Sequence, residues 1–433
     1  MPSCPNRARR HLDKLVPAKP PRTPDIHSVS PWRALAHEGF RPYFLAQAIS
    51  VLGTWIQQIA INWLVYRLSD SASLLGITAF ATMAPQLIIG PIAGAWIDRH
   101  DMRRLLVVVQ MLLCIHAAVL AWMSWAGIIG PGLLVGMSVA LGVLTSFDVP
   151  LRQTLISHLV DDPKDLPSAM ALNSMILNIG RLVGPPLAGL LIASSSEAAC
   201  FFINSISFLA PLIIVARLRP TPRPATRGPL GRLVAEGIAH ALADPPLRTL
   251  LAIMALLNLT ASAALVLLPA FARDVLSGDA RTLGLLSGAA GLGAFVAMID
   301  LARRSAMVRL VDAIATGTAI SAVALLLLAA APSSWMAAFA LLLLGYGTSV
   351  ANVAIGTLVQ TLAPPALRGR LIALVVAARF GFDALGSLVS GFAATEAGVV
   401  WTLFAQGGAL AATTFWLLRR HRSLKTAVQP LVV

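Results

Sequence analysis

Two arginines, Arg181 and Arg379, stand in stretches of sequence that are otherwise apolar or small. Arg181 lies in LNIGRLVGPPLAGLLIA (177–193), and Asp383 follows Arg379 by four residues, on the same face of a helix. A charge at the centre of a bilayer costs about 2.5–3.5 kcal/mol on insertion scales, so it persists where it has a function or a partner. We interpret Arg181 as a binding group for an anionic or hydroxyl-rich ligand, with bonds to carbonyls or to neighbouring amides as the alternative. For Arg379, ligand binding and a purely local pair with Asp383 both fit.

Polar side chains recur at helical spacing in other apolar stretches, most clearly in QAISVLGTWIQQIAIN (47–62). In lipid such side chains must face protein or water. They are predicted to line a cavity, and interhelical hydrogen bonding is the alternative. The candidates for substrate binding are Gln57, Gln58, Asn62, Asn258 and Asn352, and the candidates for carrying a proton are Asp383 and Asp148.

The segment GAWIDRHDMRR (94–104) combines residue types that can form a latch. A glycine permits close helix contact, an aspartate can face the amino terminus of a helix, and arginines can bind an acid or a helix carboxyl end. We interpret the segment as a gate, while basic residues that only fix topology are the alternative. The gate candidates are Gly94, Asp98, Arg99, Arg103 and Arg104.

Composition places most of the chain in lipid. Of 433 residues, 57% are hydrophobic and 12% are charged, whereas soluble domains carry about 25% charged residues. We attribute the net charge of +14 to basic residues that fix membrane topology rather than to binding of nucleic acid. The three cysteines lack paired or metal-ligand spacing, and the sequence has no Walker motif, no HExxH and no carboxylate cluster. We therefore expect no metal, no cofactor and no enzymatic activity.

The elements that position these residues are apolar segments of about 20 residues, the length that spans a hydrocarbon core. Twelve are predicted, in two sets of six: 43–66, 74–97, 105–126, 131–151, 168–193 and 199–217, then 248–271, 282–302, 308–330, 334–359, 370–393 and 397–418. The predicted organisation is a disordered or amphipathic tail (1–40), a six-helix half (41–217), a basic linker (218–247), a second half (248–418) and a tail (419–433).

Lysine and arginine counts orient this arrangement. With both termini in the cytoplasm, 28 of the 33 basic residues fall on the cytoplasmic side, and only Arg67, Arg273 and Arg281 fall on the other. We therefore expect a multi-pass protein of the inner (cytoplasmic) membrane with both termini cytoplasmic.

Several motifs resemble the major facilitator superfamily. GAWIDRHDMRR is similar to its loop pattern G-x3-D-[RK]-x-G-x-[RK]-[RK], with Asp101 where a glycine is usual. GRLVGPPLAG resembles its antiporter-associated span-5 pattern, and Ala171 replaces an upstream glycine of that pattern. Segments 53–76, 147–189 and 364–374 look like the branch of the enterobactin exporter and related siderophore and macrolide efflux permeases. The antiporter-like positions are Gly180, Gly184, Pro185, Ala188 and Gly189.

This resemblance implies an all-α, twelve-helix major facilitator fold with two six-helix halves. It also implies that Asp148 pairs with a loop arginine to close the cytoplasmic side. The expected function is export of a small organic molecule by proton antiport, and the expected protein is a monomer whose partners are the bilayer, protons and the cargo. An importer or lipid flippase of the same fold, and a membrane enzyme or sensor, are the alternatives.

Overall fold

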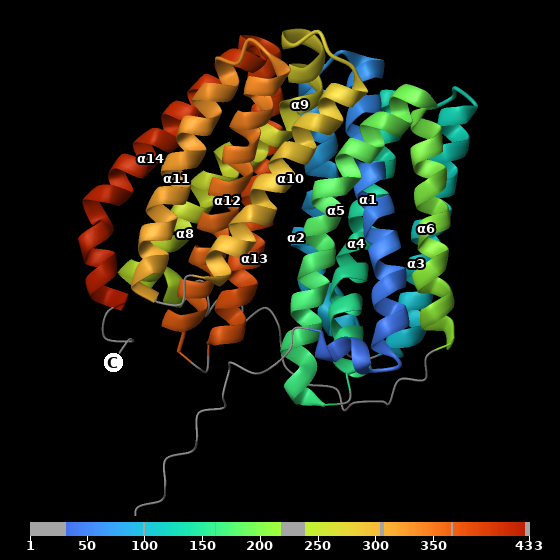
Figure 1. Ribbon diagram of the computed structural model, residues 1–433, viewed down its shortest axis with the longest axis horizontal. Coiled ribbons are helices and arrows are strands. Elements are labelled where there is room, and N and C mark those ends of the chain that lie inside the picture. Colours follow the sequence, from blue (N-terminus) through green and yellow to red (C-terminus); the bar gives the residue numbers. More distant parts are fainter. Residues whose placement is uncertain are drawn as a thin grey trace, which may run out of the picture.

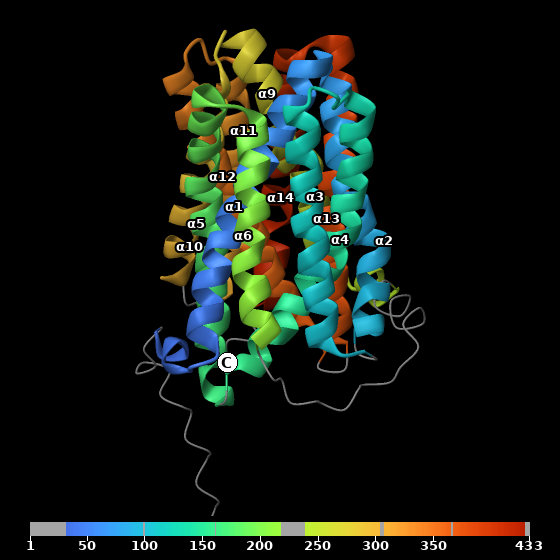
Figure 2. The same ribbon diagram turned by 90° about the vertical axis from the view of Figure 1, so that its right-hand side faces the viewer.

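The structure, a computed structural model, describes residues 32–97, 100–160, 162–217, 239–303, 307–364 and 367–428. Long helices run side by side through these residues (Figures 1 and 2). The predicted all-helical fold with twelve long helical spans is confirmed. The first six are α1 (Phe40–Ser69), α2 (Ala72–Ile97), α3 (Met102–Trp125), α4 (Pro131–Leu159), α5 (Leu166–Ser194) and α6 (Glu197–Arg217).

The second set of six begins with an irregular span over Pro245–Val275. Its parts are α8 (Pro245–Leu257), the π-helix η4 (Asn258–Ser262), the 3-10 helix η5 (Ala263–Leu267), α9 (Leu268–Ala270) and the π-helix η6 (Phe271–Val275). The others are α10 (Ala280–Ala302), α11 (Met307–Ala329), α12 (Ser334–Leu362), α13 (Arg368–Ala397) and α14 (Val399–Val428).

We call α1–α6 the N-terminal half and α8–α14 the C-terminal half. The end of the bundle where α6 stops and α8 starts is the linker end, at the bottom of Figure 1, and the opposite end is the distal end. Residues 1–31 and 218–238, in the predicted tail and linker, lie outside the described residues. The seventh span begins at Pro245, inside the predicted linker, and α14 runs past the predicted end at 418.

Eleven of the long helices are apolar enough to cross a membrane by length and composition. The twelfth, α14, contains Gln406, Thr413 and Thr414, which lower its hydropathy. All three are buried, so these polar side chains face neighbouring helices rather than lipid. Burial inside the bundle explains how α14 tolerates them.

Short polar caps fix where several helices start. The Asp101 carboxylate accepts from the Arg104 N–H at 3.2 Å and begins α3, and Asp244 accepts from Leu247 N–H at 3.2 Å and begins α8. Asp279 accepts from the Arg281 and Thr282 N–H groups at the start of α10. These caps satisfy amide donors that the first helical turn leaves unpaired.

The two halves touch through α5 against α10 and α2 against α13. Glycines permit the approach: a Cβ added to Gly189 of α5 would lie 3.1 Å from the Cα of Gly284, and one added to Gly391 of α13 would lie 2.9 Å from the Cα of Gly76. Both glycine pairs lie in the distal parts of their helices. The backbones of the two halves therefore meet closely at the distal end.

Candidate functional site

Arg181 lies midway along α5, on the side turned away from lipid. Nine residues of α-helix make about two and a half turns, so side chains nine positions apart point in opposite directions. Leu190, nine residues after Arg181, is an exposed apolar side chain. Leu187 is likewise exposed, nine residues after Asn178. Arg181 and Asn178 therefore point toward the interior of the protein.

Asp383 occupies the equivalent side of α13. Phe392, nine residues later, is exposed, and so is Val389, nine residues after Phe380. Arg379 lies one turn from Asp383, and its guanidinium carbon is 5.8 Å from the centre of the Phe380 ring. Asp383 thus points away from the exposed Phe392, whereas Phe380, with Arg379 beside it, is itself 37% exposed.

Arg181, Arg379 and Asp383, which we call the charged triad, come together across the boundary between the halves. Arg181 interacts electrostatically with both Arg379 and Asp383. Among the described residues, however, no ion pair joins any two of the three, so a direct pair between Arg379 and Asp383, one of the two alternatives left open by the sequence, does not form. Two positive charges and one negative charge leave a net positive site that can bind an anion.

One side of α1 carries uncharged polar side chains, and the other side carries apolar ones. Leu45 and Ile49 are exposed and apolar, and Thr54 and Gln58 lie nine residues after them, on the opposite side of the helix. Gln58 Nε2 donates to Asn62 Oδ1 at 3.2 Å, and both side chains are partly exposed. Gln58 and Asn62 therefore bond to each other within α1, and their place in a cavity stays a prediction.

The other three predicted binding amides bond to neighbouring helices. Asn204 Nδ2 of α6 donates to Gln57 Oε1 at 2.8 Å, and Asn258 Nδ2 donates to Asn352 Oδ1 at 2.9 Å. Gln57, Asn258 and Asn352 are all buried. The alternative interpretation, interhelical hydrogen bonding, describes these three, because their amides already have protein partners.

The antiporter-like motif packs α5 against two helices. A Cβ on Gly180 would lie 2.7 Å from Val51 Cγ1, and one on Gly184 would meet Trp55 Cβ. Both glycines therefore allow α1 to pack closely against α5. Gly189 and Pro185 instead face the start of α10. The motif therefore shapes both the helix that carries Arg181 and a boundary between the halves.

The gate segment is partly described. Gly94 lies in α2, whereas Asp98 and Arg99 lie outside the described residues. Arg103 donates to the carbonyls of Val215 and Ala216 at the end of α6, and Arg104 pairs with Asp101 at 3.3 Å. Asp101, which replaces the usual glycine, serves as the cap of α3.

Asp148 is bound within its own half. Arg152, one turn later in α4, pairs with it at 2.7 Å, and Gln110 Nε2 of α3 donates to it at 2.7 Å. The expected partnership with a loop arginine is therefore corrected for Arg103 and Arg104. Asp148 is buried, and Arg152 on the same helix can reach it. The loop arginines cannot, because Arg103 is bound to α6 and Arg104 to Asp101.

A set of contacts that the sequence did not indicate joins the halves at the distal end. Arg273 Nη1 donates to Asp70 Oδ1 at 2.6 Å, and the Tyr66 hydroxyl donates to the Asp274 carboxylate. The Ser73 N–H also donates to Thr395 Oγ1 at 3.0 Å. The only signal in the sequence was Arg273 itself, as one of three basic residues on the sparsely charged side. We call Asp70–Arg273 and Tyr66–Asp274 the distal latch.

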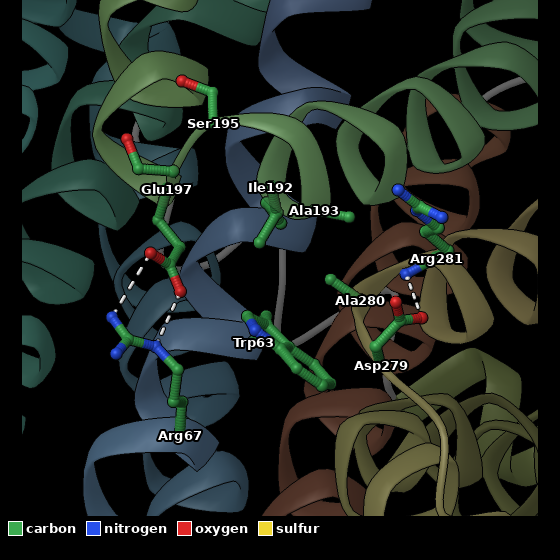
Figure 3. A pocket seen from close by; sticks show the side chains of 10 residues that line it. Trp63, Arg67, Ile192, Ala193, Ser195, Glu197, Asp279, Ala280 and Arg281 are labelled. Atoms are coloured by element: carbon green, nitrogen blue, oxygen red, sulfur yellow. Dashed lines mark hydrogen bonds and ion pairs between the residues drawn. The ribbon is translucent and has the colours of Figure 1, made fainter.

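A hollow beside this latch separates the halves between α1, α5, α6 and α10 (Figure 3). On one wall Arg67 Nε donates to Glu197 Oε1 at 2.8 Å and Arg67 Nη2 to Oε2 at 3.2 Å. Asp279 and Arg281 stand on the other wall, with Trp63 between. This hollow lies beside the close contact between Gly189 of α5 and the start of α10, and a second hollow is lined by Tyr66, Asp70 and Asp274 of the distal latch.

Solved structures with this arrangement of helices are transporters. The nucleoside transporter NupG superimposes with a TM-score of 0.70 at 11% identity, covering 88% of this chain and 98% of that chain. A bacterial homolog of the human lysosomal transporter Spinster, inward-facing and unoccupied, gives 0.65 at 14% identity, covering 90% and 96%. These likenesses show the major facilitator fold.

Curated relatives are similar over most of their length. The staphyloferrin A transporter of Staphylococcus aureus is 25% identical over 88% of this chain and 97% of its own. The enterobactin exporter of Shigella flexneri is 27% identical over 82% of this chain and 85% of its own. The transmembrane secretion effector family (MFS_3) matches residues 29–429. The chain therefore belongs to this family of major facilitator transporters, which are membrane carriers of small molecules and not enzymes.

Proposed function

We propose that the chain exports a small organic anion by proton antiport, with the cargo bound at the charged triad. The observation that carries this proposal is the net positive charge of Arg181, Arg379 and Asp383 at the boundary between the halves, for which the described residues supply no direct ion pair. Unpaired guanidinium groups in an apolar bundle need an acceptor, and a carboxylate or phenolate can bind an arginine bidentately. Gln58 and Asn62 supply hydrogen-bonding neighbours for a polyfunctional cargo.

The relatives suggest the class of cargo. One is named for enterobactin and another for staphyloferrin A, and both are similar along nearly the whole transport fold. We infer a siderophore or a related metabolite of comparable acidity. A single fold serves many cargoes, so the charge of the triad supports the class and the assay must identify the compound.

The contacts between the halves suggest how the site is loaded. The distal latch joins the halves at one end, whereas the pairs Arg104–Asp101 and Arg152–Asp148 at the linker end lie within the N-terminal half. We propose that cargo enters from the linker end and that rocking of the halves breaks the latch to release it. With both termini cytoplasmic in the inner membrane, this path is export.

Transport into everted membrane vesicles tests the proposal. Enterobactin and staphyloferrin A are offered outside, and the lumen is acidified to impose a proton gradient. Wild-type vesicles should accumulate at least one of them, and collapse of the gradient should abolish accumulation. Accumulation that is equal in wild-type and Arg181→Ala vesicles would overturn binding at the triad, and uptake only into right-side-out vesicles would indicate an importer.

Orientation is tested separately. Reporter fusions at residues 225 and 425 should both read cytoplasmic, because the basic residues concentrate on that side. A periplasmic signal at residue 225 would contradict the proposed direction of export.

A further inference from the structure

Buried polar atoms without hydrogen-bond partners gather inside the N-terminal half. They include Tyr43 Oη, Gln47 Oε1 and Ser50 Oγ of α1 and Gln110 Oε1 of α3. Each of these residues is at most 4% exposed. An unpaired buried polar atom costs about 1–3 kcal/mol, so such atoms in native proteins bond to ordered water or to a ligand.

Two of these residues, Tyr43 and Gln110, interact with the Asp148–Arg152 pair, and Gln47 and Ser50 share the helix face of Tyr43. Positions 43, 47 and 50 have the spacing of one helix face. Tyr43 interacts electrostatically with both Asp148 and Arg152, so this face of α1 points at the pair. Gln110 reaches the same carboxylate from α3. We call Tyr43, Gln47, Ser50, Gln110, Asp148 and Arg152 the N-half polar cluster.

We propose that the N-half polar cluster binds water and takes up the counter-transported proton on Asp148, at a site distinct from the charged triad. The inference rests on the proposed function and names the residue that couples it. The titratable and charged groups that face Asp148 among the described residues are Tyr43 from α1 and Arg152 from its own helix.

The charge of the cargo is the reason for a second site. An anion bound by Arg181 and Arg379 competes with ionised Asp383 for the same guanidinium groups. Cargo binding therefore favours a neutral Asp383, and a proton on Asp383 would travel in the same direction as the cargo. Antiport requires a proton that moves the opposite way, and Asp148 lies apart from the anion, inside one half.

The unpaired acceptors can provide alternative hydrogen-bond partners for Arg152. Its Nε donates to Asp148 at 2.8 Å, and a guanidinium has five N–H donors in total. When a hydronium ion of the bound water transfers its proton to a carboxylate oxygen of Asp148, a water molecule remains and the ion pair is lost. The carbonyl oxygen of Gln110, whose amide already donates to Asp148, can then accept from Arg152, which keeps its buried charge hydrogen-bonded.

Radiolytic labelling tests the bound water without any cargo. Hydroxyl radicals produced from ordered water oxidise the side chains next to it. In the purified full chain, Tyr43 should be oxidised several-fold faster than Phe201, which is equally buried but belongs to an apolar cluster. Equal rates for Tyr43 and Phe201 would overturn the water-binding cluster.

Infrared titration of the reconstituted, cargo-free chain tests the proton. As the pH is lowered, the carbonyl band of a protonated carboxylic acid should appear, and Asp148→Asn should remove a component that Asp383→Asn retains. If Asp148→Asn fails to fold, Gln110→Leu replaces it: the loss of a donor to the carboxylate should make that component appear at higher pH. Gln406→Leu, which removes an unpaired buried acceptor of the C-terminal half, should not change the pH at which the component appears.

A spectrum that is unchanged in both Asp148→Asn and Gln110→Leu would overturn the role of Asp148. Because neither measurement uses cargo, this failure is distinct from a failure of the vesicle assay.

Discussion

Polar groups between the halves differ from the hydrogen-bonded amide pairs within each half. Among the described residues the charged triad has no direct ion pair, and the distal latch crosses the same boundary through the exposed pair Asp70–Arg273 and the buried Tyr66. Inside each half, Gln57–Asn204 and Asn258–Asn352 are buried pairs with short hydrogen bonds. Groups that must change partners during transport are loosely bound, and groups that hold helices together are satisfied. Variants of the first kind should therefore alter transport, and variants of the second kind should alter stability.

The largest effect is expected at Arg181. Arg181→Ala should lower export about a hundredfold, or about 3 kcal/mol, because charge-assisted hydrogen bonds to an anion are lost. Arg181→Lys should lose most export, since lysine keeps the charge but not the planar fork. Export rates normalised to membrane protein measure both.

If Arg181 were a helix-packing residue instead, expression of both variants would fall. Well-expressed and active Arg181→Ala would contradict a role in cargo binding.

The next effect concerns a pair within one half. Asn352→Leu should lower the free energy of unfolding by about 1–2 kcal/mol, because Asn258 is left buried without its partner. The double variant Asn258→Leu/Asn352→Leu should be less destabilised than the sum of the single variants. Thermal unfolding of the purified protein measures stability, and export per folded molecule should remain unchanged. If an Asn352 variant had normal stability and no export, Asn352 would act in transport together with the charged triad.

A smaller effect is expected from the distal latch. Asp70→Arg or Arg273→Asp alone should change the export rate by no more than about fivefold, because both side chains are substantially exposed and exposed pairs contribute about 0.2–1 kcal/mol. The exchange Asp70→Arg/Arg273→Asp should restore the rate. If the double variant is slower than either single variant, the pair does not act as a latch.

The smallest effect is expected at the gate segment. Arg104→Ala should change stability by less than about 0.5 kcal/mol, since its pair with Asp101 is exposed. Arg103→Ala should destabilise more, because it removes the donor to the carbonyls of Val215 and Ala216. Thermal unfolding compares the two, and equal losses would show that the contact with α6 adds nothing.

Helix existence could be predicted because apolar length is a local property. All twelve predicted segments correspond to helical spans, and the differences concern the regularity and the ends of helices. The seventh span contains π and 3-10 segments, and Asn258, where the first of them begins, donates through its side chain to the Met254 carbonyl and to Asn352. The continuation of α14 to Val428 was missed because its last turns are basic rather than apolar.

The sequence also located the charged residues within the apolar spans, because an arginine there stands out against apolar neighbours. It could not say whether Arg379 and Asp383 pair directly, since rotamers decide that. Nor could it choose a partner for Asp148: Arg152, one turn away, and the loop arginines are all plausible by charge, and only depth and burial separate them.

The sequence by itself determined the number of helical spans, the side rich in basic residues and the positions of Arg181, Arg379 and Asp383. Only the tertiary structure decided the roles of neighbours such as Gln57 and Gln58. One bonds to Asn204 of α6 and the other to Asn62 of its own helix, because adjacent residues on a helix point about 100° apart. The latch between Tyr66 and Asp274 joins residues 208 positions apart, and helical periodicity carries no information about partners at that separation. Which faces meet is set by the packing of whole helices, and that packing depends on all of them at once.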